Sequence, residues 1–368
     1  MKFSCDKTGF SDALLNVQHA VSTKSSLPVL EGILLRASAG QVLLFAYDLE
    51  IGMTTALPAS ISEPGELVLN ARLFTEMVRR MPSDKVEISS DEKLLTTIRS
   101  GASEFTILGI PASEFPEMPA LTDAVGASLP QAELQSMLRQ THFAISSDDS
   151  KPVYMGSRFE FDNGVLRVIS IDGNRLALRT EPVDQNLSLG FVVPGKTLTE
   201  LLKLLDSESE DTVRLSVGKR HILFELNGYS VISRLLEGDF LDYNNVIGKQ
   251  SSTEVRVSVR DFLNSVDRAS LLISDKLKSP LKCIFDTDII KVICNTSIGK
   301  AYDEIPAVLT GAAVEIGFNN RFLLDALRAC ECDEVRILLN GPLSPLKIYP
   351  PEGEGFIFLV LPVRLKNE

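Results

Sequence analysis

The residue types that most often carry catalysis or metal binding are few and scattered in this chain. Cys330 and Cys332 form a C-x-C pair, but no second pair stands at zinc-ligand spacing. The three histidines, His19, His142 and His221, lie far apart, and no Ser-His-Asp or H-E-x-x-H order can be drawn from them. The pattern predicts neither a metal centre nor a bound cofactor.

Carboxylates are the remaining route to catalysis. The best form of an enzyme hypothesis is a hydrolase built on Asp48 and Asp172, which hold equivalent places 124 residues apart. A third equivalent place offers Asn295 and Thr296 instead, and Asp-Gly at 172–173 is ordinary turn chemistry. We therefore predict a protein that is not an enzyme, with the carboxylate hydrolase as the alternative.

Amphipathic helix patterns recur along the chain at a fixed interval. Apolar residues spaced i, i+3, i+4, i+7 begin at Phe10 and again at Leu134, and a second such pattern begins at Phe74 and again at Leu198. Both intervals are 124 residues. A fainter third copy continues the second pattern at Phe322. The same interval links Pro28 to Pro152 and Gly32 to Gly156. The chain is predicted to contain three copies of one unit.

Each copy combines two helices with short strands. Between the helical segments, apolar residues alternate with polar ones between turn signals, for example at 42–45, 165–168 and 289–292. We predict an α+β fold of three tandem repeats, each with two helices on an antiparallel sheet. Loop-like stretches between the copies give predicted domains of 1–121, 127–248 and 253–368.

Composition places the chain among ordinary globular proteins. Of its 368 residues, 44% are hydrophobic and 23% are charged, and no stretch approaches the ~18 uninterrupted apolar residues of a membrane span. Five scattered cysteines do not form a disulfide framework, and the N-terminal sequence has no apolar leader. We predict a cytoplasmic protein.

Repeated units that stack side by side form an open array or, if the rotation between neighbours closes, a ring. Six helices packed ~8–10 Å apart on the inside of a ring leave almost no hole. Twelve helices from two chains give a circumference of roughly 100–120 Å and a channel of roughly 20–28 Å, the scale of a nucleic-acid duplex. If there is a ring, we expect a head-to-tail homodimer with helices inside and sheets outside.

The charge distribution has the sign that such a ring requires. The whole chain carries a net charge of -12, which by itself argues against nucleic acid. Ten basic and eight acidic residues fall in the six predicted helices, so the net charge is +2 in the helices and -14 in the rest of the chain. A basic lining inside an acidic shell fits this asymmetry, and so do merely solvated helix faces. The six segments are 10–21, 70–81, 131–142, 196–206, 260–272 and 319–330.

Short motifs spread over the chain carry a resemblance to a known family. The chain resembles the bacterial DNA polymerase III beta subunit, the beta sliding clamp, over essentially its full length. The resemblance implies a processivity factor: a dimeric ring of six domains around duplex DNA, loaded by an ATP-driven clamp loader. It also implies that the DNA polymerase III alpha subunit and other clamp-binding-motif proteins bind through short peptides. The motifs are M-K-F at 1–3, L-P-V-L at 27–30, D-L-E at 48–50, F-P at 115–116, D-G-N-R-L-A at 172–177, G-D-F-L-D-Y at 238–243, E-I-G-F-N at 315–319 and L-P-V-R-L at 361–365.

The resemblance implies a partner-peptide pocket between the second and third copies. An apolar trough of this kind takes Leu, Phe or Met anchors, with Arg175 and Arg364 at its rim to hold polar groups. Three positions depart from the family pattern: Asn174 replaces a frequent His, Leu241 replaces the Pro of F-P-D-Y, and Asn245 replaces a frequent Arg. These departures leave the preferred peptide open. The implied pocket residues are Tyr154, Ile171, Gly173, Asn174, Arg175, Leu176, Leu241, Val246, Leu343, Pro345, Leu359, Leu361, Pro362, Val363 and Arg364.

The resemblance also assigns a subunit interface and a DNA-facing set. The interface would join edge strands, with Phe105 and Ile107 in the first copy against Leu272 and Ile273 in the third. A monomeric peptide-binding adaptor would share the pocket without the ring, and it remains the alternative, which sedimentation would distinguish. The implied DNA-facing residues are Lys24, Arg72, Arg79, Lys196, Lys203 and Arg321.

Overall fold

The structure is a computed structural model and describes residues 1–248, 251–274 and 279–365. The end of the third predicted domain, 366–368, lies outside the described residues. The chain divides into two compact units, Met1–Gln131 with Lys203–Leu235, and Ala132–Leu202 with Leu236–Glu368. The second predicted domain contributes to both units, and the exact domain boundaries remain a prediction.

The described elements follow the same order in each copy of the repeat. A strand and a helix are followed by three strands, a further strand or two, a second helix and three final strands. The first copy contains β1 (Lys2–Asp6), α1 (Lys7–Val17), β2 (Gly32–Ser38), β3 (Gln41–Tyr47), β4 (Ile51–Pro58), β5 (Ser60–Glu63), β6 (Gly65–Asn70), α2 (Ala71–Arg79), β7 (Lys85–Ser90), β8 (Leu95–Ser100) and β9 (Ser103–Leu108), with 3-10 helices at Gln18–Ala20, Pro28–Glu31 and Ala112–Glu114.

The second and third copies repeat this order. The second contains β10 (Val125–Pro130), α3 (Gln131–His142), a 3-10 helix at Pro152–Tyr154, β11 (Gly156–Asp162), β12 (Val165–Ile171), β13 (Arg175–Pro182), β14 (Leu189–Pro194), α4 (Gly195–Leu204), β15 (Thr212–Val217), β16 (His221–Leu226) and β17 (Tyr229–Arg234). A one-turn helix, α5 (Asn244–Ile247), leads to the third copy. That copy contains β18 (Thr253–Ser258), α6 (Val259–Ser270), β19 (Leu281–Asp286), β20 (Ile289–Thr296), β21 (Gly299–Pro306), β22 (Val308–Gly311), β23 (Val314–Phe318), α7 (Asn320–Arg328), β24 (Glu334–Leu339), β25 (Leu346–Tyr349) and β26 (Phe356–Val360).

Polar side chains cap the helices at their first turns. Asp6 accepts a backbone N–H bond at 2.8 Å, and α1 therefore begins three residues before the predicted start at Phe10. Asn70 caps α2 at 3.1 Å and Asn319 caps α7 at 3.0 Å in the same way. These bonds satisfy backbone donors that the first turn of a helix leaves unpaired.

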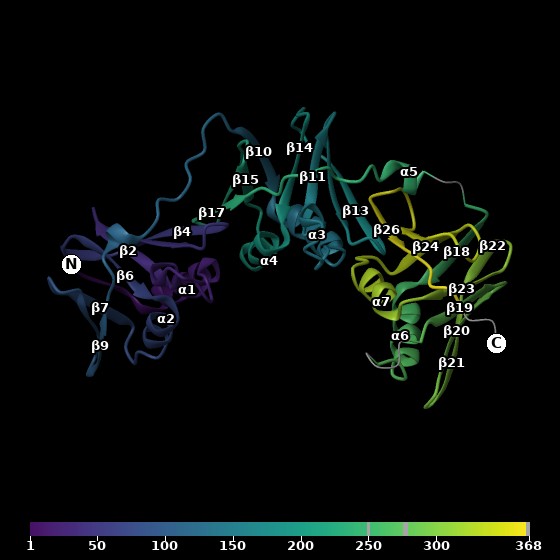
Figure 1. Ribbon diagram of the computed structural model, residues 1–368, viewed down its shortest axis with the longest axis horizontal. Coiled ribbons are helices and arrows are strands. Elements are labelled where there is room, and N and C mark those ends of the chain that lie inside the picture. Colours follow the sequence, from purple (N-terminus) through teal and green to yellow (C-terminus); the bar gives the residue numbers. More distant parts are fainter. Residues whose placement is uncertain (249–250, 275–278, 366–368) are drawn as a thin grey trace. The chain divides into compact units, whose positions relative to one another are not determined.

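Aromatic side chains hold the helices against the sheets. In the first copy, the Phe10 ring lies edge-on to two other rings. Its centroid is 6.0 Å from that of Phe3 on β1 and 5.8 Å from that of Phe74 on α2. In the third copy, Phe262 of α6 meets Phe285 of β19 at 6.3 Å. Figure 1 shows α1 beside α2 in the first unit and α6 beside α7 in the second. The predicted apolar faces of these helices are therefore buried in the core.

Antiparallel sheets run across the boundaries between copies. In the first unit the strand orders are β5-β1-β7-β8-β9 and β10-β15-β16-β17-β4-β3-β2-β6. In the second unit they are β14-β11-β12-β13-β26-β25-β24-β18-β22 and β21-β20-β19-β23. Strand β17 of the second copy thus pairs with β4 of the first, and β26 of the third copy pairs with β13 of the second.

The two joints between copies use equivalent strands. In each joint, the last strand of one copy (β17 or β26) pairs with the third strand after the first helix of the preceding copy (β4 or β13). Two further strands hold the same positions in their own copies. Strand β9 is the last strand of the first copy, and β21 is the third strand after α6 in the third copy. Both stand at an edge of their sheet in the described chain. Each end of the repeat therefore presents one half of the same kind of joint.

Candidate functional site

An apolar cluster in the second unit gathers residues of the predicted partner-peptide pocket. Ile171, Leu176 and Leu359 are buried in it, and Val246 and Leu361 pack against it half-buried. The pairing of β13 with β26 places Leu176 opposite Leu359. We call the apolar cluster of these five residues the trough. Its residues come from three separate stretches of sequence, so the trough exists only when the sheet that joins two copies has formed.

The C-terminal segment lies against the turn between β12 and β13. The backbone N–H of Leu361 donates to the carbonyl of Asn174 at 2.8 Å, and that of Val363 donates to the carbonyl of Gly317 at 2.8 Å. Gly173 adopts a φ of +89° in this turn, a left-handed conformation that favours glycine. The turn and the C-terminal segment therefore form one continuous edge of the trough.

Arg175 is enclosed by charged and aromatic partners. Its Nε donates to Asp172 Oδ2 at 2.8 Å and its Nη1 donates to Asp325 Oδ2 on α7 at 2.6 Å. The guanidinium also lies over the rings of Phe322, at 4.6 Å, and Phe143, at 5.5 Å. Only 11% of the Arg175 side chain is exposed. It ties the turn beside the trough to α7, and its contact with a peptide remains a prediction.

The other predicted pocket residues surround the trough without entering its buried cluster. Leu241, Leu343 and Val363 are large apolar side chains with 44%, 71% and 41% of their surface exposed. Exposed apolar surface of this kind is typical of a protein-binding site. The Tyr154 ring meets Phe240 edge-on at 5.6 Å. The remaining predicted residues are Pro345 and Pro362, which are half-buried, and Arg364, which is exposed.

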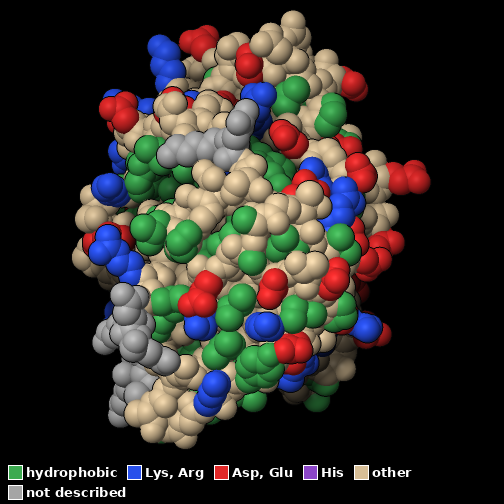
Figure 2. Space-filling view, turned by 90° about the vertical axis from the view of Figure 1, so that its right-hand side faces the viewer, with side chains coloured by type: hydrophobic (Ala, Val, Ile, Leu, Met, Phe, Trp, Pro, Cys, Tyr) green, Lys and Arg blue, Asp and Glu red, His purple; other side chains and the backbone are tan. Residues whose placement is uncertain are grey.

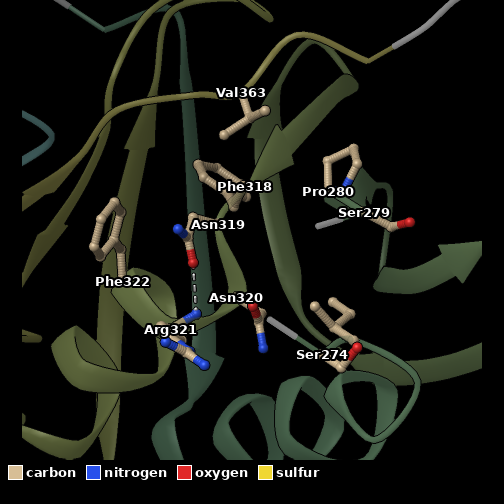
Figure 3. A pocket seen from close by; sticks show the side chains of 10 residues that line it. Ser274, Ser279, Pro280, Phe318, Asn319, Asn320, Arg321, Phe322 and Val363 are labelled. Atoms are coloured by element: carbon tan, nitrogen blue, oxygen red, sulfur yellow. Dashed lines mark hydrogen bonds between the residues drawn. The ribbon is translucent and has the colours of Figure 1, made fainter. Parts of the chain in front are cut away.

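A cavity of about 440 Å³ adjoins the C-terminal segment at Val363. Phe318 and Phe322 contribute apolar walls, and in Figure 3 the side chain of Asn319 accepts the backbone N–H of Arg321 beside them. Of its lining residues, the predicted pocket included only Val363. Ile273, which was predicted for the subunit interface, also lines this cavity. The E-I-G-F-N motif ends with Phe318 and Asn319, which line this cavity, and it was the sequence signal from which this part of the site could have been predicted.

The second helix of each copy carries cations at the same two positions. The second residue of the helix is Arg72 in α2, Lys196 in α4 and Arg321 in α7, and seven residues later stand Arg79, Lys203 and Arg328. Residues seven apart lie on one face of a helix, and all six side chains are exposed. Arg328 was missing from the predicted DNA-facing set, although the repeat interval leads from Arg79 through Lys203 to it.

The helix dipole accounts for only one of these two positions. Cations in the last turn, such as Arg79, Lys203 and Arg328, are favoured by the partial negative charge at a helix C-terminus. A cation near the N-terminus is instead disfavoured, by ~0.3–1 kcal/mol. Its recurrence in all three copies therefore indicates a requirement other than helix stability.

The side chains that pair with these cations are themselves exposed, so the positive charge stays accessible to solvent and to a ligand. Arg79 pairs with Glu76 at 2.9 Å, and Arg328 pairs with Asp267 at 3.3 Å. The Nζ of Lys203 lies 3.4 Å from His19 Nδ1. Exposed pairs of this kind contribute only ~0–1 kcal/mol, so a phosphate can compete for the cation. Lys24, the loop residue of the predicted set, is also exposed.

The predicted interface residues lie on or near the two free joint strands. Phe105 and Ile107 belong to β9, where Phe105 is 41% exposed. Leu272 and Ile273 follow α6 and pack partly against the core of the third copy. Further large apolar side chains are exposed beside them and on β21 and its turn: Leu271 (81%), Ile298 (67%) and Tyr302 (53%). The prediction named none of these three.

Figure 2 views the face of the second unit on the side of β22. Hydrophobic side chains stand there among acidic and basic ones. Val308 of β22 is 63% exposed. Single exposed apolar side chains among charges are normal for a protein surface, so this face by itself indicates no binding site.

Asp48 and Asp172 cap equivalent turns. The Oδ1 of Asp48 accepts two backbone N–H groups at 2.9 and 2.8 Å, and the Oδ1 of Asp172 accepts two at 2.8 and 3.0 Å. This is the ordinary turn geometry of an aspartate side chain. Their equivalence in the repeat therefore has a structural cause.

The cysteines have no activating environment. Burial raises the pKa of Cys5 to about 12 and raises the pKa of both Cys330 and Cys332, so these thiols stay protonated at neutral pH. Across 1–248, 251–274 and 279–365, no group of three or more His, Cys, Asp or Glu side chains is placed to hold a metal ion. In the same ranges, no helix is long and apolar enough to cross a lipid bilayer.

Family models match almost the whole chain. They describe the N-terminal domain of the DNA polymerase III beta subunit over residues 1–119, its central domain over 128–242 and its C-terminal domain over 244–364. The chain belongs to the DNA polymerase III beta subunit family. The predicted family and the α+β clamp fold of three repeats are thereby confirmed.

Individual relatives agree with the family models along their full length. The beta sliding clamp of Bacillus subtilis (strain 168) is 33% identical over 377 residues, which cover 99% of this chain and 100% of the relative. The crystal structure of the DNA polymerase sliding clamp from Bacillus subtilis has a TM-score of 0.96 at 33% identity and covers 100% of both chains. A sliding clamp from Bartonella birtlesii bound to griselimycin has a TM-score of 0.93 at 29% identity, with 99% of this chain and 100% of that chain covered. The monomeric adaptor is not favoured by these likenesses.

Proposed function

We propose that this chain is one half of a head-to-tail homodimeric ring that encircles duplex DNA and tethers a DNA polymerase and other DNA-processing proteins through the trough. The observation that carries the proposal is that the equivalent strands β9 and β21 both stand at a sheet edge within the described part of the chain. The pairing of β9 with the partner chain's β21 would repeat the joints β17–β4 and β26–β13. Each chain has one edge of each kind, so two such joints close a ring of two chains.

Apolar side chains support this assignment of the interface. An unpaired strand edge is a ready template for another chain, and β9 and β21 carry Phe105 and Tyr302 in exposed positions. Leu271 and Ile298 add apolar surface near β21. We assign the interface to these four residues together with the predicted Ile107, Leu272 and Ile273.

The six recurring cations support a DNA-facing role for the second helices. A ring that slides must hold the phosphate backbone loosely and without reading bases, which exposed Arg and Lys side chains do. We assign this role to Lys24 and to the six cations of α2, α4 and α7, with Arg328 added to the predicted set. Twelve helices from two chains leave a channel of roughly 20–28 Å for the duplex.

The trough supports the tethering role. Buried Leu176 and Leu359 offer a floor for apolar anchors, and exposed Leu241, Leu343 and Val363 offer walls. An apolar groove with a few polar groups at its edge is a common mode of peptide recognition. The Bartonella birtlesii clamp is bound to griselimycin, which supports a ligand-binding surface in this fold.

A tethering ring needs no catalytic group, and the turn-capping roles of Asp48 and Asp172 leave the hydrolase alternative without a reactive carboxylate pair. We therefore propose that the protein is not an enzyme. Binding partners would be the DNA polymerase III alpha subunit, a clamp loader and other clamp-binding-motif proteins.

Retention on circular DNA tests the ring directly. With a clamp loader and ATP, the protein should elute with nicked circular plasmid in gel filtration and should be lost once the plasmid is cut by a restriction enzyme, because a ring slides off the ends. Without the loader, binding should be weak, independent of sequence and lost as salt rises. Equal retention on circular and linear plasmid, or tight salt-resistant binding to one sequence, would contradict the topological ring.

A further inference from the structure

The segment Phe240–Ile247, which we call the clasp, forms one wall of the trough. It includes α5 and contributes Leu241 and Val246 to the predicted pocket. Leu241 is 44% exposed, whereas Phe240, Val246 and Ile247 pack against the apolar cluster and Tyr243 is buried in it. A short segment with one helical turn has little structure of its own, so its position depends on the contacts that hold it.

Tyr243 anchors the middle of the clasp to β11. Its hydroxyl donates to Glu160 Oε2 at 2.6 Å, and the side chain is 6% exposed. The other carboxylate oxygen of Glu160 accepts from Arg158 at 3.0 and 3.2 Å. Burial, and then the hydrogen bond to Glu160, raise the pKa of Tyr243 far above its usual range, so the hydroxyl remains a donor at any physiological pH. A hydrogen bond to a charged acceptor is stronger than a neutral one.

The two ends of the clasp are anchored as well. At its start, the Phe240 ring contacts the Tyr154 ring edge-on, with 5.6 Å between the ring centroids, and the Arg158 guanidinium lies 5.8 Å from the Phe240 centroid. At its end, the Nζ of Lys347 on β25 donates to the carbonyl of Ile247 at 2.8 Å. Lys347 is only 5% exposed, which is rare for a lysine and requires compensating polar contacts.

These anchors come from different copies of the repeat. Glu160 and Arg158 lie on β11 of the second copy, whereas Lys347 lies on β25 of the third. In the sequence, Leu241 lies between the anchored residues Phe240 and Tyr243, and Val246 directly precedes Ile247, whose carbonyl Lys347 binds. We propose that Tyr243, Glu160 and Lys347 are positioning residues for partner binding, which fix the clasp so that Leu241 and Val246 stand in place before a peptide arrives. The inference rests on the proposed function of the trough.

The variant Tyr243→Phe tests the clasp because it removes one hydroxyl and keeps the ring. We expect it to bind a fluorescein-labelled ten-residue peptide with adjacent Leu and Phe anchors about three- to tenfold more weakly, as one lost hydrogen bond predicts. Lys347→Met should weaken binding to a similar extent, and Lys347→Arg, which keeps a donor, should restore part of it. Tyr349→Phe is the matched control, because Tyr349 is buried to 5% exposure in the same cluster and lies outside the clasp.

Hydrogen exchange gives a readout in the absence of peptide. The amides of Val246 and Ile247 donate to the Tyr243 carbonyl, and they should exchange faster in Tyr243→Phe than in Tyr349→Phe while the amides of β11 stay protected. If the unaltered protein does not bind the peptide, the proposed trough is wrong. If it binds, the clasp inference is overturned either when Tyr243→Phe and Lys347→Met bind within twofold of it or when Tyr349→Phe is impaired equally.

Discussion

Arg175 shows how one side chain connects separate parts of the second unit. Its guanidinium bridges Asp172 of the turn and Asp325 of α7, with aromatic rings over it. The family resemblance implied that Arg175 stands at the rim of the pocket and holds polar groups of a peptide. The partner Asp325 is 150 residues away in the chain, and no periodicity marks such a pair, so the enclosure of Arg175 could not be predicted.

Replacing Arg175 with Met should lower the free energy of unfolding by about 3–5 kcal/mol, because it leaves the carboxylate of Asp172, whose side chain is only 12% exposed, without its counter-charge. Urea denaturation followed by circular dichroism measures the change. Arg36→Met is the control: Arg36 pairs with Glu66 at 2.8 Å with about half of its side chain exposed (48%), and its loss should cost less than about 1 kcal/mol. Equal midpoints for the two variants would mean that the Arg175 network does not stabilise the fold.

At the scale of elements, the fixed interval made the helices predictable. Apolar residues at helical spacing located both helices of each copy, and the copies supported one another where one pattern was weak. The start of α1 was missed because Asp6, its cap, lies outside the apolar pattern. The clasp was also missed, since its order comes from Glu160 and Lys347, far away in the sequence. The pocket residues came from the resemblance, because their spacing alone resembles that of core residues.

The C-terminal segment is the element that most directly links the fold to partner binding. Deleting residues 361–368 should abolish binding of the Leu/Phe peptide, whose affinity for the intact protein should be about micromolar. The loss follows from removing Leu361 and Val363, which the structure holds beside Asn174 and Gly317. Fluorescence anisotropy measures the affinity. Sedimentation should find the truncated protein still dimeric, since β9 and β21 lie elsewhere, and unchanged peptide affinity would place the partner site outside the trough.

At the scale of the whole molecule, assembly depends on side chains that the isolated chain leaves partly exposed. The double variant Leu272→Ala/Ile273→Ala should sediment as a folded monomer at low micromolar concentration, because each large apolar truncation at a buried joint costs ~2–5 kcal/mol. Phe105→Ala on β9 should weaken the dimer from the other side of the joint.

Circular dichroism must show that these variants stay folded, because Leu272 and Ile273 also contact the core of the third copy. Val125→Ala is the matched control, since Val125 is an exposed apolar residue (40%) on β10, which belongs to a different sheet from β9 and from β21. It should remain dimeric. A dimer that survives the changes at Leu272, Ile273 and Phe105 would show that the interface lies elsewhere.

The equivalence of the sheet joints also determines where a closed ring could open. In the proposed dimer, the joints β17–β4 and β26–β13 connect strands of one polypeptide, so a broken joint faces its partner at the high effective concentration that a tether imposes. The β9–β21 joints have no such tether, and their re-formation depends on the concentration of free chains or on the opposite joint remaining closed. Of the six equivalent joints in the ring, four would therefore lie within a chain and stay closed, and two would lie between chains. DNA would enter the ring where one of these two intersubunit joints opens.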